Sequence, residues 1–183
     1  MRVFGMAGTL RDESFNRRLL DAARAVAPQG MEIVPHDIED VPLYDADLEK
    51  EGDPEPVQRL KRAIGQADAL LISTPEYQHG VPGVLRNALD WASRPPGAAP
   101  LTGKPVAIMG ATPGFIGTAR AQKQLRQLLA YNDCPMVMEP EVLVGHVDEK
   151  VDHDGHITDE ETLDFVRELL GNLAGLVAIH EEA

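Results

Sequence analysis

Hydrophobic positions along the chain follow two alternating patterns. Short, continuous apolar runs are typical of buried parallel strands, and they lie at residues 3–7, 31–34, 69–73, 106–109 and 136–138. In the intervening segments, apolar residues recur every three or four positions, which predicts amphipathic helices. These helices are expected near residues 15–26, 57–67, 81–89, 117–129 and 163–177. The chain therefore alternates strand and helix from end to end.

Local signals indicate where several of these elements begin and end. Ser14 is placed to cap the first helix, and Pro82 stands near a helix start, where its missing N–H costs little. Thr158 and Glu161 form the pattern of a capping box before the last helix. The segment 37–55 is rich in Asp, Glu and Pro and is expected to be a loop. The fifth strand is expected to begin at Met136 and to continue brokenly toward Val144.

This order of elements predicts an α/β fold with a five-stranded parallel sheet covered by helices on both faces. No change of composition marks a boundary, so residues 1–183 are expected to form one domain. In such sheets, ligands bind beyond the carboxyl ends of the strands, where the strand order reverses. The loops after the first, third and fourth strands are therefore the candidate site.

Composition narrows the classes of partner. The formal net charge of −13 opposes binding to nucleic acid, and no apolar run is long enough for a membrane helix. Without a recognisable secretion signal, a cytoplasmic location is expected. The single cysteine, Cys134, is expected to be a buried structural thiol. His153 and His156 lie near Asp152 and Asp154, but a solvated turn is expected there rather than a metal site.

The loop after the first strand carries donors suited to an anion. Arg11, Arg17 and Arg18 concentrate positive charge near the start of a helix, whose free N–H groups also favour anions. The loop lacks both the Gly-Lys-Ser/Thr ending of a P-loop and the GxGxxG spacing of dinucleotide folds, so a monophosphate fits better. The alternative is a capped helix with a solvated arginine.

The other two loops could hold a flat ring. Residues 74–80 combine Pro75 and Gly80 with the planar side chains of Tyr77 and His79. Residues 110–117 contain glycines that allow close approach of a ligand, with Phe115 at the border. Each loop alone could be a simple turn. Together they predict one shared cleft.

Several segments carry a resemblance to a known family. They are Gly8-Thr9-Leu10-Arg11 with Ser14 and Asn16, Pro42 to Asp45, Pro75-Glu76-Tyr77, Pro82 to Leu85, Asn87 to Trp91, and Leu101 to Val106. Over essentially its whole length the chain resembles the NADPH-dependent FMN reductases, and among them most closely the bacterial chromate and quinone reductases. Gln78 stands where that family commonly has Asn, and Thr9 where it commonly has Ser.

The resemblance implies a flavodoxin-like three-layer sandwich that binds FMN. It implies that Thr9, Arg11, Ser14 and Asn16 hold the phosphate, that residues 75–78 line the isoalloxazine, and that residues 110–117 complete the far side. The full set of expected cofactor-binding residues is Gly8, Thr9, Arg11, Ser14, Phe15, Asn16, Pro75, Glu76, Tyr77, Gln78, Gly110, Thr112, Gly114 and Gly117.

The implied activity is an FMN-dependent oxidoreductase using NADPH or NADH as co-substrate. Electrons would pass by a ping-pong mechanism to quinones or other small acceptors: azo, chromate or nitro compounds, or free flavin. No catalytic side chain is expected, because flavin N5 would carry the chemistry; Tyr77 and His79 could orient a substrate. A homodimer or homotetramer is also implied. The alternative is a non-enzymatic flavodoxin-like electron carrier or flavin-binding module.

Overall fold

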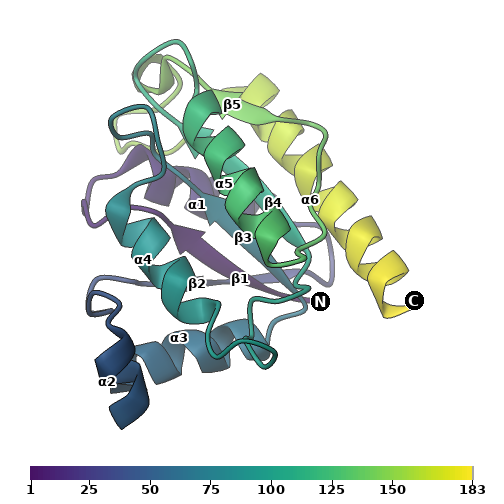
Figure 1. Ribbon diagram of the computed structural model, residues 1–183. Helices are drawn as coiled ribbons and strands as arrows, with labels where there is room; N and C mark the ends of the chain where they lie inside the picture. Colours follow the sequence, from purple (N-terminus) through teal and green to yellow (C-terminus); the bar gives the residue numbers. More distant parts are fainter. Residues whose placement is uncertain (183) are drawn as a thin grey trace.

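A computed structural model describes residues 1–182 and shows a three-layer α/β arrangement (Figure 1). The five strands form one parallel sheet in the order β2-β1-β3-β4-β5. They are β1 (Arg2–Ala7), β2 (Glu32–His36), β3 (Ala69–Ser73), β4 (Val106–Ala111) and β5 (Val142–Val144). The predicted α/β class and the all-parallel sheet are confirmed.

The helices cover both faces of the sheet. They are α1 (Phe15–Ala25), α2 (Ala46–Glu51), α3 (Glu55–Gly65), α4 (Gly83–Ala92), α5 (Ala119–Tyr131) and α6 (Glu160–Glu181), with a 3-10 turn at Val147–Glu149. Apolar residues of α1 and α6 pack on one face of the sheet, and those of α3, α4 and α5 pack on the other. In Figure 1, α4 and α5 lie in front of the strands, and both termini lie at the end away from the strand carboxyl ends.

The central strands are buried on both faces. Every residue of β3 and β4 is buried, which explains why their sequences read as continuous apolar runs rather than as an alternating pattern. β1 and β3 lie side by side, although β2 comes between them in sequence. The strand order therefore reverses between β1 and β3, and the loops after these two strands flank the reversal.

The fifth strand follows the broken path expected from Met136 toward Val144: Met136 makes an isolated parallel bridge to Val106 of β4, and the ladder with β4 resumes at Val142–Val144. Between the two, Pro140 has no N–H to donate to a strand partner. Two other sequence-based expectations are corrected. The segment expected to be a loop contains α2, which has no buried residue and so shows no apolar periodicity. The last helix is capped by Asp159, whose side chain accepts from Thr162 N, and not by Thr158.

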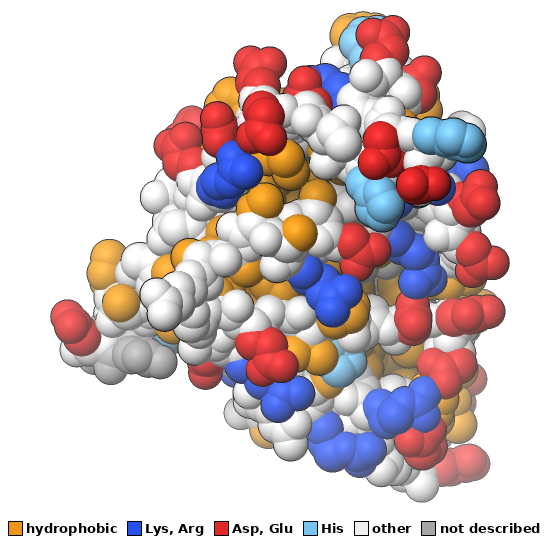
Figure 2. All heavy atoms as spheres, turned by 180° about the vertical axis from the view of Figure 1, so that it is seen from behind, with side chains coloured by type: hydrophobic (Ala, Val, Ile, Leu, Met, Phe, Trp, Pro, Cys, Tyr) orange, Lys and Arg blue, Asp and Glu red, His pale blue; other side chains and the backbone are white. Residues whose placement is uncertain are grey.

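No helix within residues 1–182 has both the length and the apolar character needed to cross a bilayer. The view from behind shows acidic side chains distributed over the surface with Lys and Arg between them (Figure 2).

Candidate functional site

A cavity of about 390 Å³ opens at the carboxyl ends of β1 and β3. Its lining comes from the loop after β1 and from the segment that leads into α4. The lining residues are Thr9, Leu10, Arg11, Tyr77, Pro82, Gly83 and Val84. Arg11 is the charged member of this set, and most of the others are apolar. The cavity can therefore receive an apolar ring with an anionic group at the Arg11 end.

The loop after β1 is folded around hydrogen bonds of its own. The buried Thr9 hydroxyl accepts from Arg11 N at 3.2 Å and lies 3.4 Å from the Tyr77 hydroxyl. Gly8 N donates to Ser73 O at 2.9 Å, which ties the loop to the end of β3. These contacts hold the start of the loop against the Tyr77 side of the cavity.

The start of α1 is arranged as the sequence predicts. Ser14 caps the helix, and its hydroxyl oxygen accepts from Asn16 N at 3.2 Å. Other N–H groups in this first turn have no earlier acceptor within the helix, so they are available to an anion. Within residues 1–182, the exposed Arg11 guanidinium has no hydrogen-bond or ion-pair partner. Arg11 therefore offers its donors at the cavity, and the free N–H groups of α1 lie at the end of the loop that carries Arg11.

Arg17 supports this loop from outside. Its Nε donates to Arg11 O at 3.1 Å, and a terminal nitrogen lies 3.5 Å from Thr9 O. The other terminal nitrogen pairs with Asp37 at 2.5 Å, beyond the end of β2. By engaging two loop carbonyls from one side, Arg17 restrains the backbone that carries Thr9 and Arg11.

Tyr77 is presented by a tight hairpin. Tyr77 N donates to Gly80 O at 3.1 Å, and Gly80 N donates to Tyr77 O at 3.0 Å. The two central residues, Gln78 and His79, have φ of 49° and 63°, as a type I′ turn requires. Asn and Gly are the residues most favoured at such positions, so Gln78 is an unusual choice there. The side chain of Gln124 in α5 holds the hairpin from outside: its Oε1 accepts from Val81 N at 3.2 Å, and its Nε2 donates to His79 O at 3.4 Å.

Several predicted site residues have structural partners instead of facing the cavity. The Glu76 carboxylate accepts from Arg120 N at 2.9 Å and Ala121 N at 3.1 Å, so it caps the start of α5. Phe15 packs against the core beneath α1. Asn16 is buried and bonds to the ends of two strands.

The loop after β4 does not line this cavity. A Cβ on Gly110 would lie 2.0 Å from Thr118 Oγ1, and a Cβ on Gly117 would lie 2.4 Å from the Leu143 carbonyl carbon. These glycines allow the polypeptide to pack against itself. Thr112 Oγ1 accepts from Gly114 N at 3.3 Å within the loop, and Phe115 is exposed. This cavity therefore joins the first two of the three loops, and a role of residues 110–117 in binding a cofactor stays a prediction.

Sequence reasoning did not assign Leu10, Pro82, Gly83 or Val84 to the site. Pro82, Gly83 and Val84 follow the hairpin closely in sequence. A tight turn at residues 77–80 would bring them back beside Tyr77, and this was the signal that could have placed them in the cavity lining.

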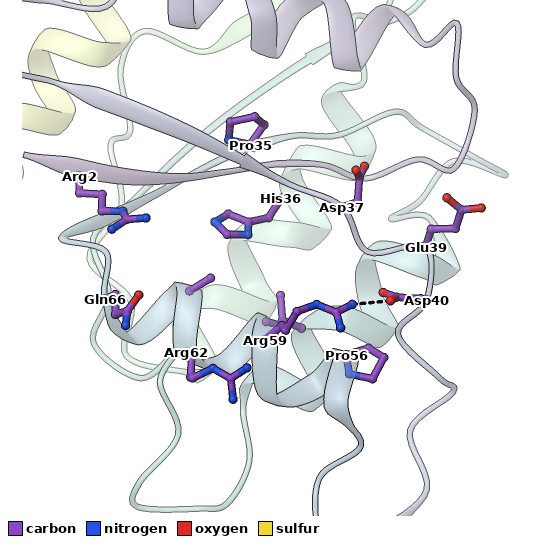
Figure 3. A pocket seen from close by; sticks show the side chains of 12 residues that line it. Arg2, Pro35, His36, Asp37, Glu39, Asp40, Pro56, Arg59, Arg62 and Gln66 are labelled. Carbon is purple, nitrogen blue, oxygen red and sulfur yellow. Dashed lines mark hydrogen bonds and ion pairs between the residues drawn. The ribbon is translucent and has the colours of Figure 1, made fainter.

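A larger cavity of about 740 Å³ lies elsewhere, between β2 and α3 (Figure 3). His36 stacks on Phe4 there, with ring centroids 4.5 Å apart, and burial lowers the pKa of its imidazole. Arg59 is already paired with Asp40 and Glu55. This cavity lies along the outer edge of the sheet, away from the strand reversal.

Comparison with known proteins agrees with this geometry. Residues 1–149 match the family described as NADPH-dependent FMN reductase. An NAD(P)H-dependent FMN reductase of Pseudomonas aeruginosa is 42% identical over 170 residues, covering 93% of this chain and 91% of the relative. A quinone reductase of Escherichia coli is 44% identical over 170 residues, covering 91% and 89%.

A solved structure is similar over the whole fold. The flavoenzyme FerB of Paracoccus denitrificans, an NAD(P)H:(acceptor) oxidoreductase, superposes with a TM-score of 0.89 at 37% identity, and the match covers 98% of both chains. Because a family model matches most of its length and relatives of 42% and 44% identity cover most of both chains, the chain belongs to the NADPH-dependent FMN reductase family.

Proposed function

We propose that this chain binds FMN in the cavity between Arg11 and Tyr77 and uses it to pass electrons from NADPH or NADH to a quinone or another small acceptor. As a family member, the chain is an FMN-dependent NAD(P)H oxidoreductase. The observation that carries the assignment to this cavity is the unpaired Arg11 guanidinium at the end of an otherwise uncharged lining.

The residues present fit the cofactor. A phosphate at the start of α1 would meet the free N–H groups of the first turn and the Arg11 guanidinium. Leu10, Tyr77, Pro82 and Val84 offer an apolar wall for a ring system. When bound, FMN supplies hydride acceptance and electron transfer, so the protein contributes binding, orientation and exclusion of water. No protein nucleophile is required.

The assignment of the phosphate site is tested by Arg11→Ala. Losing a charge-assisted hydrogen bond of about 1.5–3 kcal/mol should weaken FMN binding about 10–150-fold. The measurement is FMN titration of flavin-free protein, followed by quenching of flavin fluorescence. Arg24→Ala is the matched control, because Arg24 lies in the last turn of α1 and pairs with Asp21. An unchanged affinity in Arg11→Ala would refute the phosphate assignment.

We further propose that the two substrates use the cavity in turn, in a ping-pong mechanism. The nicotinamide and a planar acceptor would both have to stack on the same exposed face of a bound flavin, so the second substrate would have to replace the first. Initial rates with NADPH and a benzoquinone should give parallel double-reciprocal lines, and intersecting lines would rule out ping-pong order. Absence of turnover with quinone, azo, chromate and nitro acceptors and free flavin would indicate an electron carrier.

A homodimer or homotetramer is also proposed. Leu43, Phe115 and Tyr131 are 82%, 79% and 89% exposed, and contact with a second copy would remove such apolar surface from water. Sedimentation velocity tests this, and a monomer at micromolar concentration would contradict it. A single domain over residues 1–183 and a cytoplasmic location remain proposals, tested by limited proteolysis and by cell fractionation.

A further inference from the structure

The side chain of Asn16 lies where three elements meet, and it is 3% exposed. Its Nδ2 donates to Ala111 O at 2.9 Å, and its Oδ1 accepts from Ala111 N at 3.0 Å. The Ser73 hydroxyl donates to the same Oδ1 at 3.1 Å. Ala111 ends β4 and Ser73 ends β3, so one amide group joins the start of α1 to the ends of both strands.

This arrangement leaves the amide with little capacity for a ligand. An amide oxygen has two acceptor positions, and both are occupied here, as is one of the two N–H groups. The partners Ser73 and Ala111 are 57 and 95 residues away in sequence, so these side-chain contacts are tertiary contacts and not part of the local helix cap. The Asn16 backbone N–H donates separately to Ser14 Oγ.

The position of this amide bears on the cavity. Thr9 and Arg11 precede α1, whereas Tyr77 and Pro82 follow β3. In FMN, phosphate and ring are covalently linked, so the two halves of the cavity must stand at a matching separation. Gly8 N donates to Ser73 O and so joins the ends of β1 and β3, and the Asn16 side chain joins the start of α1 to the ends of β3 and β4.

We propose that the Asn16 side chain is a positioning residue, which sets the spacing between the phosphate end and the ring end of the cavity, and not a ligand of the phosphate. This inference rests on the proposed function. It predicts that losing the amide harms every flavin equally, whether or not the flavin carries a phosphate.

The test compares FMN with riboflavin, which lacks the phosphate, on the flavin-free full-length chain. Arg11→Ala should weaken FMN binding and leave riboflavin within about twofold, since it removes a phosphate contact only. Asn16→Ala should weaken both flavins by the same factor, about 5–50-fold, because misplaced contacts lose affinity steeply. Ser73→Ala, which removes one donor to Oδ1, should give a smaller parallel loss of about 2–10-fold.

A control separates positioning from general loss of stability. Val177→Ala removes buried atoms near the end of α6, remote from the cavity, and should lower the melting temperature without changing either flavin affinity. The visible circular dichroism of bound FMN should change in Asn16→Ala and stay unchanged in Val177→Ala.

Three results would overturn the inference. The first is that Asn16→Ala weakens the binding of FMN but not of riboflavin, which would make the amide a phosphate ligand. The second is that Asn16→Ala leaves the affinity for both flavins unchanged. The third is that the circular dichroism of bound FMN changes as much in Val177→Ala as in Asn16→Ala. If Asn16→Ala does not fold, Ser73→Ala decides by the same criteria. If the wild-type chain binds neither flavin, the proposed function itself fails, and that result is distinct from the other three.

Discussion

Three arginines close together in sequence have three different roles. Arg11 is exposed and unpaired beside the cavity, whereas Arg17 engages two loop carbonyls and Asp37. Arg18 lies across Gly155, and its terminal nitrogen is 3.5 Å from Asp154 O. The sequence predicts concentrated positive charge here but not this division, because Asp37 and Asp154, which hold Arg17 and Arg18, belong to other segments of the chain.

Cys134 illustrates a residue whose chemistry is set by its surroundings. It is buried, and its thiol donates to Leu101 O at 3.2 Å. Burial raises the pKa of this thiol to about 11, so almost no thiolate exists at neutral pH. The structural role predicted from sequence agrees with this environment.

We therefore expect Cys134 to resist thiol reagents while the protein is folded. At pH 8 the native chain should react with a disulfide reagent such as DTNB far more slowly than the chain unfolded in urea, which should react at the rate of a free cysteine. Absorbance of the released thiolate gives both rates. Equal rates in the two states would contradict the buried position of the thiol.

At the scale of elements, strands with two buried faces were the most predictable. β1, β3 and β4 coincide closely with apolar runs in the sequence. The run at Met136 has the same appearance, yet it makes only an isolated bridge to β4. The ladder with β4 resumes after Pro140, at Val142–Val144. α2 could not be found from periodicity, because it buries nothing.

The start of α6 gives a prediction about pH. Asp159 accepts from Lys150 Nζ at 2.6 Å and from Thr162 N at 3.0 Å, and these hydrogen bonds lower the pKa of its carboxyl from 3.8 to about 2. A carboxyl with a lowered pKa stabilises the fold above its unfolded pKa. That stabilisation is lost as pH falls from about 4 toward about 2.

Asp159→Ala should accordingly lower the free energy of unfolding at pH 7 by about 1–2 kcal/mol, and the difference from wild type should shrink below pH 4. Urea unfolding at pH 7, 5 and 3 measures this. Asp164→Ala in the same helix is the control, since Asp164 is largely exposed and its pair with Arg167 should contribute little. A difference that grew on acidification would contradict the assignment.

At the scale of the whole molecule, the segment after β2 is docked on α4 by polar side chains. Asn87 Nδ2 and Trp91 Nε1 both donate to Pro42 O at 2.8 Å, and Asn87 Oδ1 accepts from Tyr44 N at 2.8 Å. The Tyr44 ring meets Trp91 edge to face at 5.0 Å. Two segments that carried the family resemblance, Pro42 to Asp45 and Asn87 to Trp91, thus contact each other.

Trp91→Phe tests this docking. Trp91 is fully buried, so losing its hydrogen bond and part of its volume should cost about 1–3 kcal/mol of unfolding free energy. Urea unfolding followed by far-ultraviolet circular dichroism is suitable, because the variant has no tryptophan left to report by fluorescence. Tyr131→Phe, at an exposed position, should leave stability unchanged. A cost below about 0.5 kcal/mol would show that the contact is dispensable.

Sequence reasoning predicted where a cavity opens but not all of the residues that line it. The position of the cavity follows from strand order, and Arg11, Thr9 and Tyr77 were predicted to belong to it. Glu76 caps α5, and Gly110 and Gly117 pack closely against other segments, which their residue types alone do not indicate, because a polar or small residue beside a ligand loop looks the same in either role. Such distinctions depend on contacts between segments distant in the chain.

The hairpin at Tyr77 is closed by backbone hydrogen bonds in both directions and fastened to α5 through Gln124. We expect this wall of the cavity to keep its position when a ligand binds. We therefore expect the cavity to select ligands by their thickness. Flat acceptors of unrelated chemistry should enter alike, while a single bulky out-of-plane substituent should be enough to keep a molecule out.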